Sequence, residues 1–135
     1  LHLSLRRQRQ MCIRDRKKIY DDITQLIEHF KPDVMSVEKL FFNINVTTAI
    51  PVGQARGVVL LAAANKGIPV MEFTPMQIKQ SVVGTGSATK EQVIYMVMHL
   101  LNIREKIKPD DVADALAAAI CCLNTASTRR WQEGR

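Results

Sequence analysis

The chain has 135 residues, of which 47% are hydrophobic and 24% charged, which suits one compact α/β domain with a buried core. Its formal net charge is +6, but residues 1–16 hold five arginines against one aspartate, so basicity alone argues only weakly for nucleic acid. The longest strongly apolar run, Val58 to Ala64, is too short to cross a bilayer, and we expect no membrane partner. The three cysteines show no metal-ligand spacing, which indicates a reduced, cytoplasmic compartment.

The first segment, residues 1–16, is rich in arginine and glutamine and shows neither a helical nor an alternating pattern. One interpretation is a basic arm that contacts nucleic acid. Its composition differs from everything that follows, and it has no apolar stretch of signal-peptide length. We therefore interpret residues 1–16 as a non-native leader and leave them out of the fold prediction.

An amphipathic helix is predicted from Lys17 onward, and it ends before Pro32 because the residue before a proline disfavours the helical conformation. Its apolar face is formed by Ile19, Ile23, Leu26, Ile27 and Phe30.

A short buried strand is predicted at Val34–Glu38, apolar except for Ser36 until its last residue. Glu38 thus lies at the carboxyl end of the strand, where open α/β sheets place their chemistry. The alternative is an ordinary exposed glutamate at a strand end. Phe41 and Phe42 follow in a predicted loop. An aromatic side chain beside an acidic site can stack on a base, whereas we expect Phe42 to fill the core.

A long helix is predicted from Thr47 or Thr48 to Lys66, with Pro51 in its first turn. Gly53 and Gly57, four residues apart, clear one face of this helix for close packing. That face can meet a neighbouring helix or a second subunit, and packing within the chain is the default expectation.

A second strand is predicted at Ile68–Phe73, followed by a helix that Thr74 caps and Gly84 ends. That helix carries Lys79. A loop of small residues then leads from Gly84 to Lys90, but its spacing does not match a phosphate-binding P-loop.

The helix after the glycine loop can be capped by Ser87 or by Thr89, and Thr89 with Gln92 makes the reciprocal capping pattern. Free amides at its start, with Lys90 beside them, can hold a phosphate of a nucleic-acid backbone, and Lys79 can do the same. Each lysine taken alone is more often a solvated surface charge. The predicted buried face of the helix is Val93, Met96, Val97, Leu100 and Leu101.

An acidic helix begins at Asp110 or Asp111, either of which can act as its cap, and stays apolar to Cys122. Asp111 and Asp114 are three residues apart and project from one side of its first turn. Carboxylates near a helix start also occur simply because the helix dipole favours them. Together with Glu38, however, they suit a divalent cation and metal-assisted hydrolysis of a phosphodiester. Past Asn124 we expect a loose polar tail.

Four stretches of this sequence resemble the RuvC family of bacterial Holliday-junction resolvases, in register from about Lys17 to Cys122. They are Val37–Phe41, Gly53–Gly57, Gln77–Gly86 and Asp111–Ala117. The resemblance implies three segments: the leader at 1–16, a RuvC-like nuclease domain fragment at 17–123 and a polar basic tail at 124–135.

The resemblance implies an RNase H-like α/β fold, with a mixed sheet flanked by helices, in a homodimer that nicks four-way junction DNA during recombination and repair. It further implies magnesium as the cofactor, with manganese as a substitute, and the RuvA–RuvB branch-migration complex as a partner. By position, Glu38, Asp111 and Asp114 would bind the metal, and Lys79 and Lys90 would be active-site lysines near the scissile phosphate. Phe41 would stack on an unpaired base at the crossover, and the helix from Gly53 to Lys66 would form the dimer face.

The sequence departs from the RuvC pattern at its start. The family begins with a strand that carries an Asp-Pro-Gly segment, followed by two more strands, and nothing before Lys17 matches them. Asp15 is no substitute. Two other functions therefore stay open: a non-catalytic DNA-binding or dimerisation module, and a YqgF-type RNase H-like nuclease that acts on RNA.

From this departure we expect the chain to show little or no nuclease activity, because one metal-bridging carboxylate is missing from the matched segment. The measurement is a nicking assay on a synthetic four-way junction with magnesium. Robust cleavage by this chain would contradict the expectation.

Overall fold

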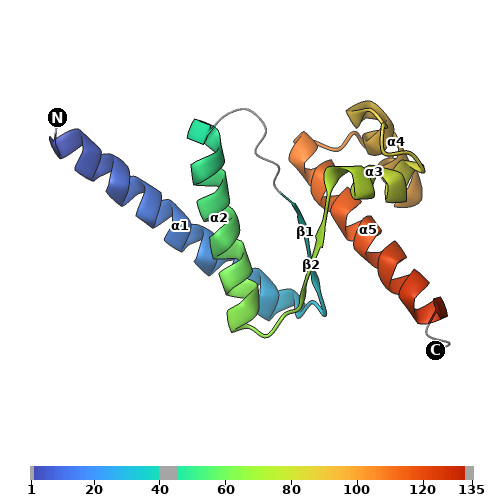
Figure 1. The fold of residues 1–135 in the computed structure, drawn as a ribbon, viewed down its shortest axis with the longest axis horizontal. Coiled ribbons are helices and arrows are strands. Elements are labelled where there is room, and N and C mark those ends of the chain that lie inside the picture. The colour runs from blue at the N-terminus through green and yellow to red at the C-terminus, as the bar shows by residue number, and fades with distance from the viewer. Residues whose placement is uncertain (1, 40–45, 133–135) are drawn as a thin grey trace. The chain divides into compact units, whose positions relative to one another are not determined.

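A computed structural model describes residues 2–39 and 46–132, without the side chains of residues 2–12, 46–48 and 128–132. Its elements are α1 (His2–Phe30), β1 (Met35–Glu38), α2 (Val46–Asn65), β2 (Val70–Phe73), α3 (Pro75–Val83), α4 (Lys90–Leu100) and α5 (Asp110–Gln132) (Figure 1). They form two compact units: unit 1 holds α1 and α2, and unit 2 holds α3, α4, α5 and most of both strands. Within the described ranges, no helix has the length and apolarity that a bilayer span requires.

The two strands pair in parallel with a constant register. The Met35 amide donates to the Pro69 carbonyl at 2.9 Å, and the Lys39 amide donates to the Phe73 carbonyl at 2.7 Å. The carboxyl ends of both strands therefore meet at the same edge, and Glu38, the last residue of β1, lies at that edge. The predicted strands were one or two residues longer at their amino ends than the observed ones.

In unit 1, α1 packs along α2 (Figure 1). The Asn65 side chain donates to the Tyr20 hydroxyl at 2.8 Å, and the Arg16 guanidinium donates to Gln54 at 2.6 Å. The apolar face predicted for α1 is only partly buried, because Leu26 and Phe30 are 51% and 71% exposed. The buried apolar side chains of this unit are Ile27, Ala62 and Ala63.

The first helix extends further back than the sequence pattern predicted. α1 runs without interruption from His2 to Phe30, whereas the prediction began at Lys17. Pairs four residues apart, Lys17 with Asp21 and Lys18 with Asp22, support its middle turns. Helical structure in residues 2–16 thus overturns the expectation that this segment lacks a regular element. Their assignment as a non-native leader stays a prediction.

The second helix differs from its prediction at two positions. Pro51 is the sixth residue of α2, one turn later than predicted. A Cβ added at Gly57 would meet no atom within 4 Å in the described part of the chain, so close packing within the chain does not explain this glycine. Phe41 and Phe42 lie outside the described residues.

In unit 2, α3, α4 and α5 pack against one another (Figure 1). The side of α5 that faces inward is made of small residues, which lets backbone groups come close. The Ser36 hydroxyl of β1 donates to the Ala118 carbonyl of α5 at 2.7 Å, which ties the strand directly to the helix backbone. The buried side chains on α5 are Ala113, Ala117, Ala118, Ile120, Cys121 and Cys122.

The cap predicted at Thr74 and the capping box predicted at Thr89 are both present, and Thr74 also forms a capping box that was not predicted. Thr74 caps α3 with Gln77, and Thr89, rather than Ser87, caps α4 with Gln92. Gly84 ends α3 in the left-handed conformation with φ of 90°, which glycine adopts without strain. On α4 only Val93 and Val97 are buried, while Leu100 and Leu101 of the predicted buried face are 51% and 42% exposed.

The last helix continues well past the predicted end. α5 remains helical to Gln132, so residues 124–132 are not the loose tail that their polarity suggested. Asn124 explains part of this helical extension. Its side-chain amide donates to the carbonyl oxygen of Ser81 at 3.3 Å and to the hydroxyl of Ser81 at 3.1 Å. A polar residue here attaches α5 to α3.

The cap at Thr89 is expected to contribute directly to stability. Replacing Thr89 by alanine leaves the Gln92 amide without its acceptor, which should lower the free energy of unfolding by about 1 kcal/mol in chemical denaturation. Thr89→Ser keeps the hydroxyl and is the matched control. Equal losses in the two variants would show that the hydroxyl does not cap α4.

Candidate active site

Four of the predicted site residues are brought into one neighbourhood of unit 2 from four different elements. Glu38 ends β1, Lys79 lies in α3, Lys90 is the first residue of α4, and Asp114 lies in the second turn of α5. The parallel strand brings Glu38 to the carboxyl edge of the sheet, and the Thr89 cap starts α4 at Lys90.

Glu38 has both a like charge and an opposite charge near it. Partial burial is the largest cause that raises the pKa of Glu38 above its usual value, and the negative charge of Asp114 raises it further. The positive charge of Lys79 acts in the other direction. The carboxyl groups of Glu38 and Asp114 therefore interact across β1 and α5, and Lys79 partly offsets their repulsion.

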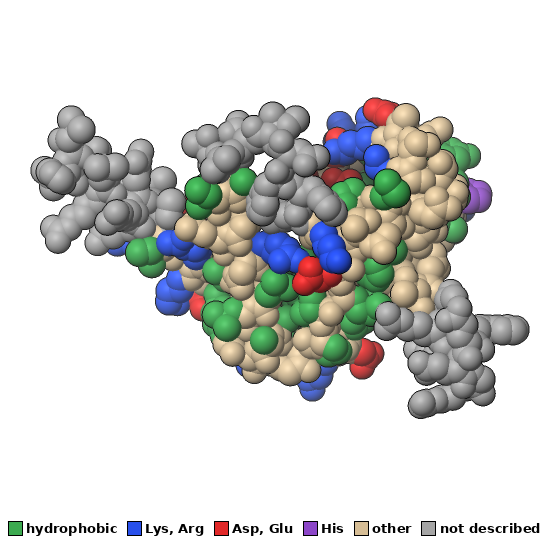
Figure 2. All heavy atoms as spheres, in the orientation of Figure 1, with side chains coloured by type: hydrophobic (Ala, Val, Ile, Leu, Met, Phe, Trp, Pro, Cys, Tyr) green, Lys and Arg blue, Asp and Glu red, His purple; other side chains and the backbone are tan. Residues whose placement is uncertain are grey.

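Lys90 contacts two carboxylates of α5. Its Nζ lies 3.4 Å from Oδ2 of Asp110 and 3.8 Å from Oδ2 of Asp114. The pKa of Lys90 is raised first by its hydrogen bond to Asp110 and then by the charge of Asp114. All three side chains are about half exposed, so each pair by itself stabilises the fold only slightly. Figure 2 shows basic and acidic side chains adjacent on the surface formed by α4 and the start of α5.

Asp110 is a site residue that the sequence prediction did not include, since it was interpreted only as a possible helix cap. The structure instead pairs Asp110 with Lys90, while Asp111 makes the smallest contribution to the raised pKa of Lys90. Spacing was the signal that could have identified it. Asp110 and Asp114 are four residues apart on a helix and so share a face, as neighbours on successive turns do.

The carboxylates of this cluster fit a divalent cation in part. In residues 2–39 and 46–132, no three acidic, histidine or cysteine side chains come close enough together to hold a metal ion. Two carboxylates, those of Glu38 and Asp114, do interact, and their repulsion is what a cation relieves. Carboxylate oxygens are the ligands that hard divalent cations prefer. The residues fit magnesium in their chemistry, and the complete set of three stays a prediction.

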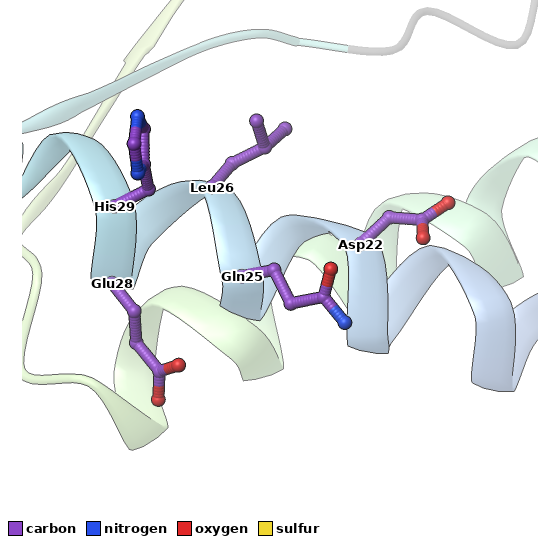
Figure 3. Close-up of a pocket in the computed structure, with 5 residues that line it drawn as sticks. All are labelled: Asp22, Gln25, Leu26, Glu28 and His29. Atoms are coloured by element: carbon purple, nitrogen blue, oxygen red, sulfur yellow. The ribbon is translucent and has the colours of Figure 1, made fainter.

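Two other features of the chain are not included in this cluster: Phe41 and a pocket on α1. Phe41 is outside the described residues. His29 lies on α1 with its ring edge against Phe30, and a shallow pocket beside it is lined by α1 residues (Figure 3). Those side chains point in different directions from the helix, so the acidic ones do not converge there (Figure 3). The lining residues are Asp22, Gln25, Leu26, Glu28 and His29.

Comparison with known sequences gives one matching family model, described as crossover junction endodeoxyribonuclease RuvC, over residues 5–122. The match begins earlier than the resemblance at Lys17. A crossover junction endodeoxyribonuclease RuvC of Moorella thermoacetica is 57% identical over 115 residues. That alignment covers 85% of this chain and 69% of the relative.

Two solved structures are similar in fold. The RuvC structure of Thermus thermophilus has a TM-score of 0.81 and 36% identity, covering 87% of this chain and 70% of that one. The same organism's RuvC in complex with a Holliday junction substrate has a TM-score of 0.78 and 38% identity, covering 82% of this chain and 67% of that one. Similarity at this level shows a common RNase H-like fold.

The charge of Asp114 raises the pKa of Glu38, and removing that charge tests the interaction. Asp114→Asn removes a like charge, so the pKa of Glu38 should fall but stay above its usual value, because partial burial remains. Lys79→Met removes the opposing charge and should raise it further. The measurement is an NMR titration of the Glu38 carboxyl carbon, with Glu91→Gln as a control. An unchanged Glu38 pKa in Asp114→Asn would show that the two groups do not interact.

Proposed function

Because the chain belongs to the RuvC family of crossover junction endodeoxyribonucleases, we propose that its acidic site serves to hydrolyse phosphodiester bonds at four-way DNA junctions in recombination and repair. The observation that carries the proposal is the interaction of Glu38 with Asp114, flanked by Lys79 and Lys90. Acidic groups that interact across separate elements, with lysines beside them, are what metal-assisted cleavage of a phosphodiester requires.

Each residue has a proposed part in this chemistry. Glu38 and Asp114, with Asp111, would hold magnesium or, as a substitute, manganese. A cation held by these residues would supply an activated water and would stabilise the leaving oxygen. Lys79 and Lys90 would bind the phosphate and offset the charge that accumulates on it as the bond breaks. The resemblance assigns base stacking at the crossover to Phe41.

The proposed partners are a second copy of the chain, four-way junction DNA and the RuvA–RuvB complex. A second copy of the chain is proposed to pack on α2, which has exposed apolar side chains at Val52 and Leu61 and open space around Gly57. Four-way junction DNA is the proposed substrate, since a Thermus thermophilus RuvC has been solved with a Holliday junction. The RuvA–RuvB complex rests on family resemblance. A reduced cytoplasmic setting suits the adjacent free thiols of Cys121 and Cys122.

Junction binding is the direct test, since it does not depend on cleavage by this chain. We expect the chain to bind a labelled four-way junction more tightly than a linear duplex or a structured RNA of the same length, in fluorescence anisotropy. Lys79→Ala and Lys90→Ala should each weaken junction binding about 3- to 10-fold and reduce the salt slope by about one.

Lys18→Ala, which removes a lysine of α1 paired with Asp22, is the matched control and should leave binding nearly unchanged. Any magnesium-dependent nicking above background should be lost in Glu38→Gln and in Asp114→Asn. Equal affinity for junction and linear duplex would refute the proposed substrate, and preference for RNA would favour the YqgF-type alternative.

A further inference from the structure

The Lys90 ammonium lies between carboxylates on successive turns of α5, and the two carboxylates differ in what else they face. Asp114 is 3.8 Å from Nζ of Lys90 and also interacts with Glu38, whereas Asp110 is 3.4 Å from Nζ. The charge of Asp114 raises the pKa of Glu38, whereas the hydrogen bond from Lys90 to Asp110 is the largest cause that raises the pKa of Lys90. Asp114 thus interacts with both Lys90 and Glu38, whereas Asp110 pairs with Lys90.

We propose that Asp110 is a positioning residue, which retains the Lys90 ammonium beside the acidic site when Asp114 turns to a divalent cation. The proposal rests on the metal site proposed above. Without a bound cation, the Lys90 ammonium balances the negative charges of both Asp110 and Asp114. When a cation binds Asp114, Lys90 shifts onto Asp110, still at the start of α4 where a phosphate would meet it.

The geometry makes this shift short. Asp110 and Asp114 are on one face of α5, four residues apart, and Lys90 already contacts both. An ammonium and a divalent cation that share one carboxylate repel each other strongly at such distances. A second carboxylate within reach lets the ammonium move away from the cation without losing its partner. Asp111 is a weaker candidate for this part, because its charge makes the smallest contribution to the raised pKa of Lys90.

The ordinary role of Asp110 is to stabilise the start of α5, because negative charge is favoured at a helix N-terminus. Asp110→Asn separates the two roles. Asparagine can still cap a helix start through its side-chain oxygen, but it lacks the charge that the helix dipole favours and that holds the ammonium. Loss of helix stability would appear in denaturation, and loss of positioning would appear in metal binding.

The test is a manganese titration of the full chain, followed by NMR through paramagnetic broadening of the amide signals of Glu38 and Ala113. This readout detects even millimolar binding and needs no catalysis. In Asp110→Asn, Lys90 has only Asp114 to pair with and competes harder with the cation. We expect the apparent affinity for Mn²⁺ to fall about 3- to 10-fold in this variant.

Lys90→Met removes the competitor, so it should bind Mn²⁺ more tightly than wild type. Adding Asp110→Asn to Lys90→Met should then change the affinity less than about twofold, since the double-mutant cycle isolates the pair. Asp110→Glu should restore wild-type binding. Glu91→Gln, which removes a neighbouring negative charge that does not contact Lys90, is the control for general electrostatics and should also stay within about twofold.

The outcomes separate the two proposals. If Mn²⁺ broadens neither signal in any variant, the metal site itself is wrong and the inference falls with it. If Mn²⁺ binds wild type and Asp110→Asn equally, or if the loss in Asp110→Asn is the same with and without Lys90, the positioning role is refuted while the metal site stands.

Discussion

The interaction on which the site depends is the repulsion between Glu38 and Asp114, two like charges that the fold holds close enough to raise the pKa of Glu38. Partial burial is the larger cause of the raised pKa of Glu38, because it disfavours the charged carboxylate, and the charge of Asp114 adds to it. Such an arrangement persists only where other contacts hold the strand and the helix in place. The hydrogen bond from Ser36 to the Ala118 carbonyl and the alanine-rich inner face of α5 provide that restraint.

Two lysines from other elements, Lys79 of α3 and Lys90 of α4, partly offset this negative charge. Lys79 offsets the charge of Glu38, and Lys90 pairs with the two carboxylates of α5. Lys90 can do so because Thr89, the residue before it, caps α4 and so makes Lys90 its first residue, and because α4 packs on α5. The glycine-containing loop before α4 therefore serves to place a helix start and its lysine, in keeping with its lack of P-loop spacing.

Local sequence signals worked best where the structure is local. The cap at Thr74, the capping box at Thr89 and the glycine that ends α3 were predicted at the correct residues, because each depends on groups within four positions along the chain. Apolar faces were less reliable. Leu26, Phe30, Leu100 and Leu101 fit helical spacing, yet they are exposed in the structure, because burial depends on whether another element covers that face. The helical stretches at 2–16 and 124–132 were missed for a similar reason, since polar residues give no period.

For the site, the sequence alone determined the residue types and their places at element ends: Glu38 at the end of a strand, Lys90 after a cap, and acidic residues at a helix start. The resemblance to RuvC was also found from these residues, and the family match and the Thermus thermophilus fold support it. Only the tertiary structure decided which of these residues meet. It paired Lys90 with Asp110 and brought Glu38 into the range of Asp114 and Lys79, whereas Asp111 acts on Lys90 only weakly. The physical reason is that charges interact through space, and the packing of β1, α3, α4 and α5, not their order in the chain, sets those distances.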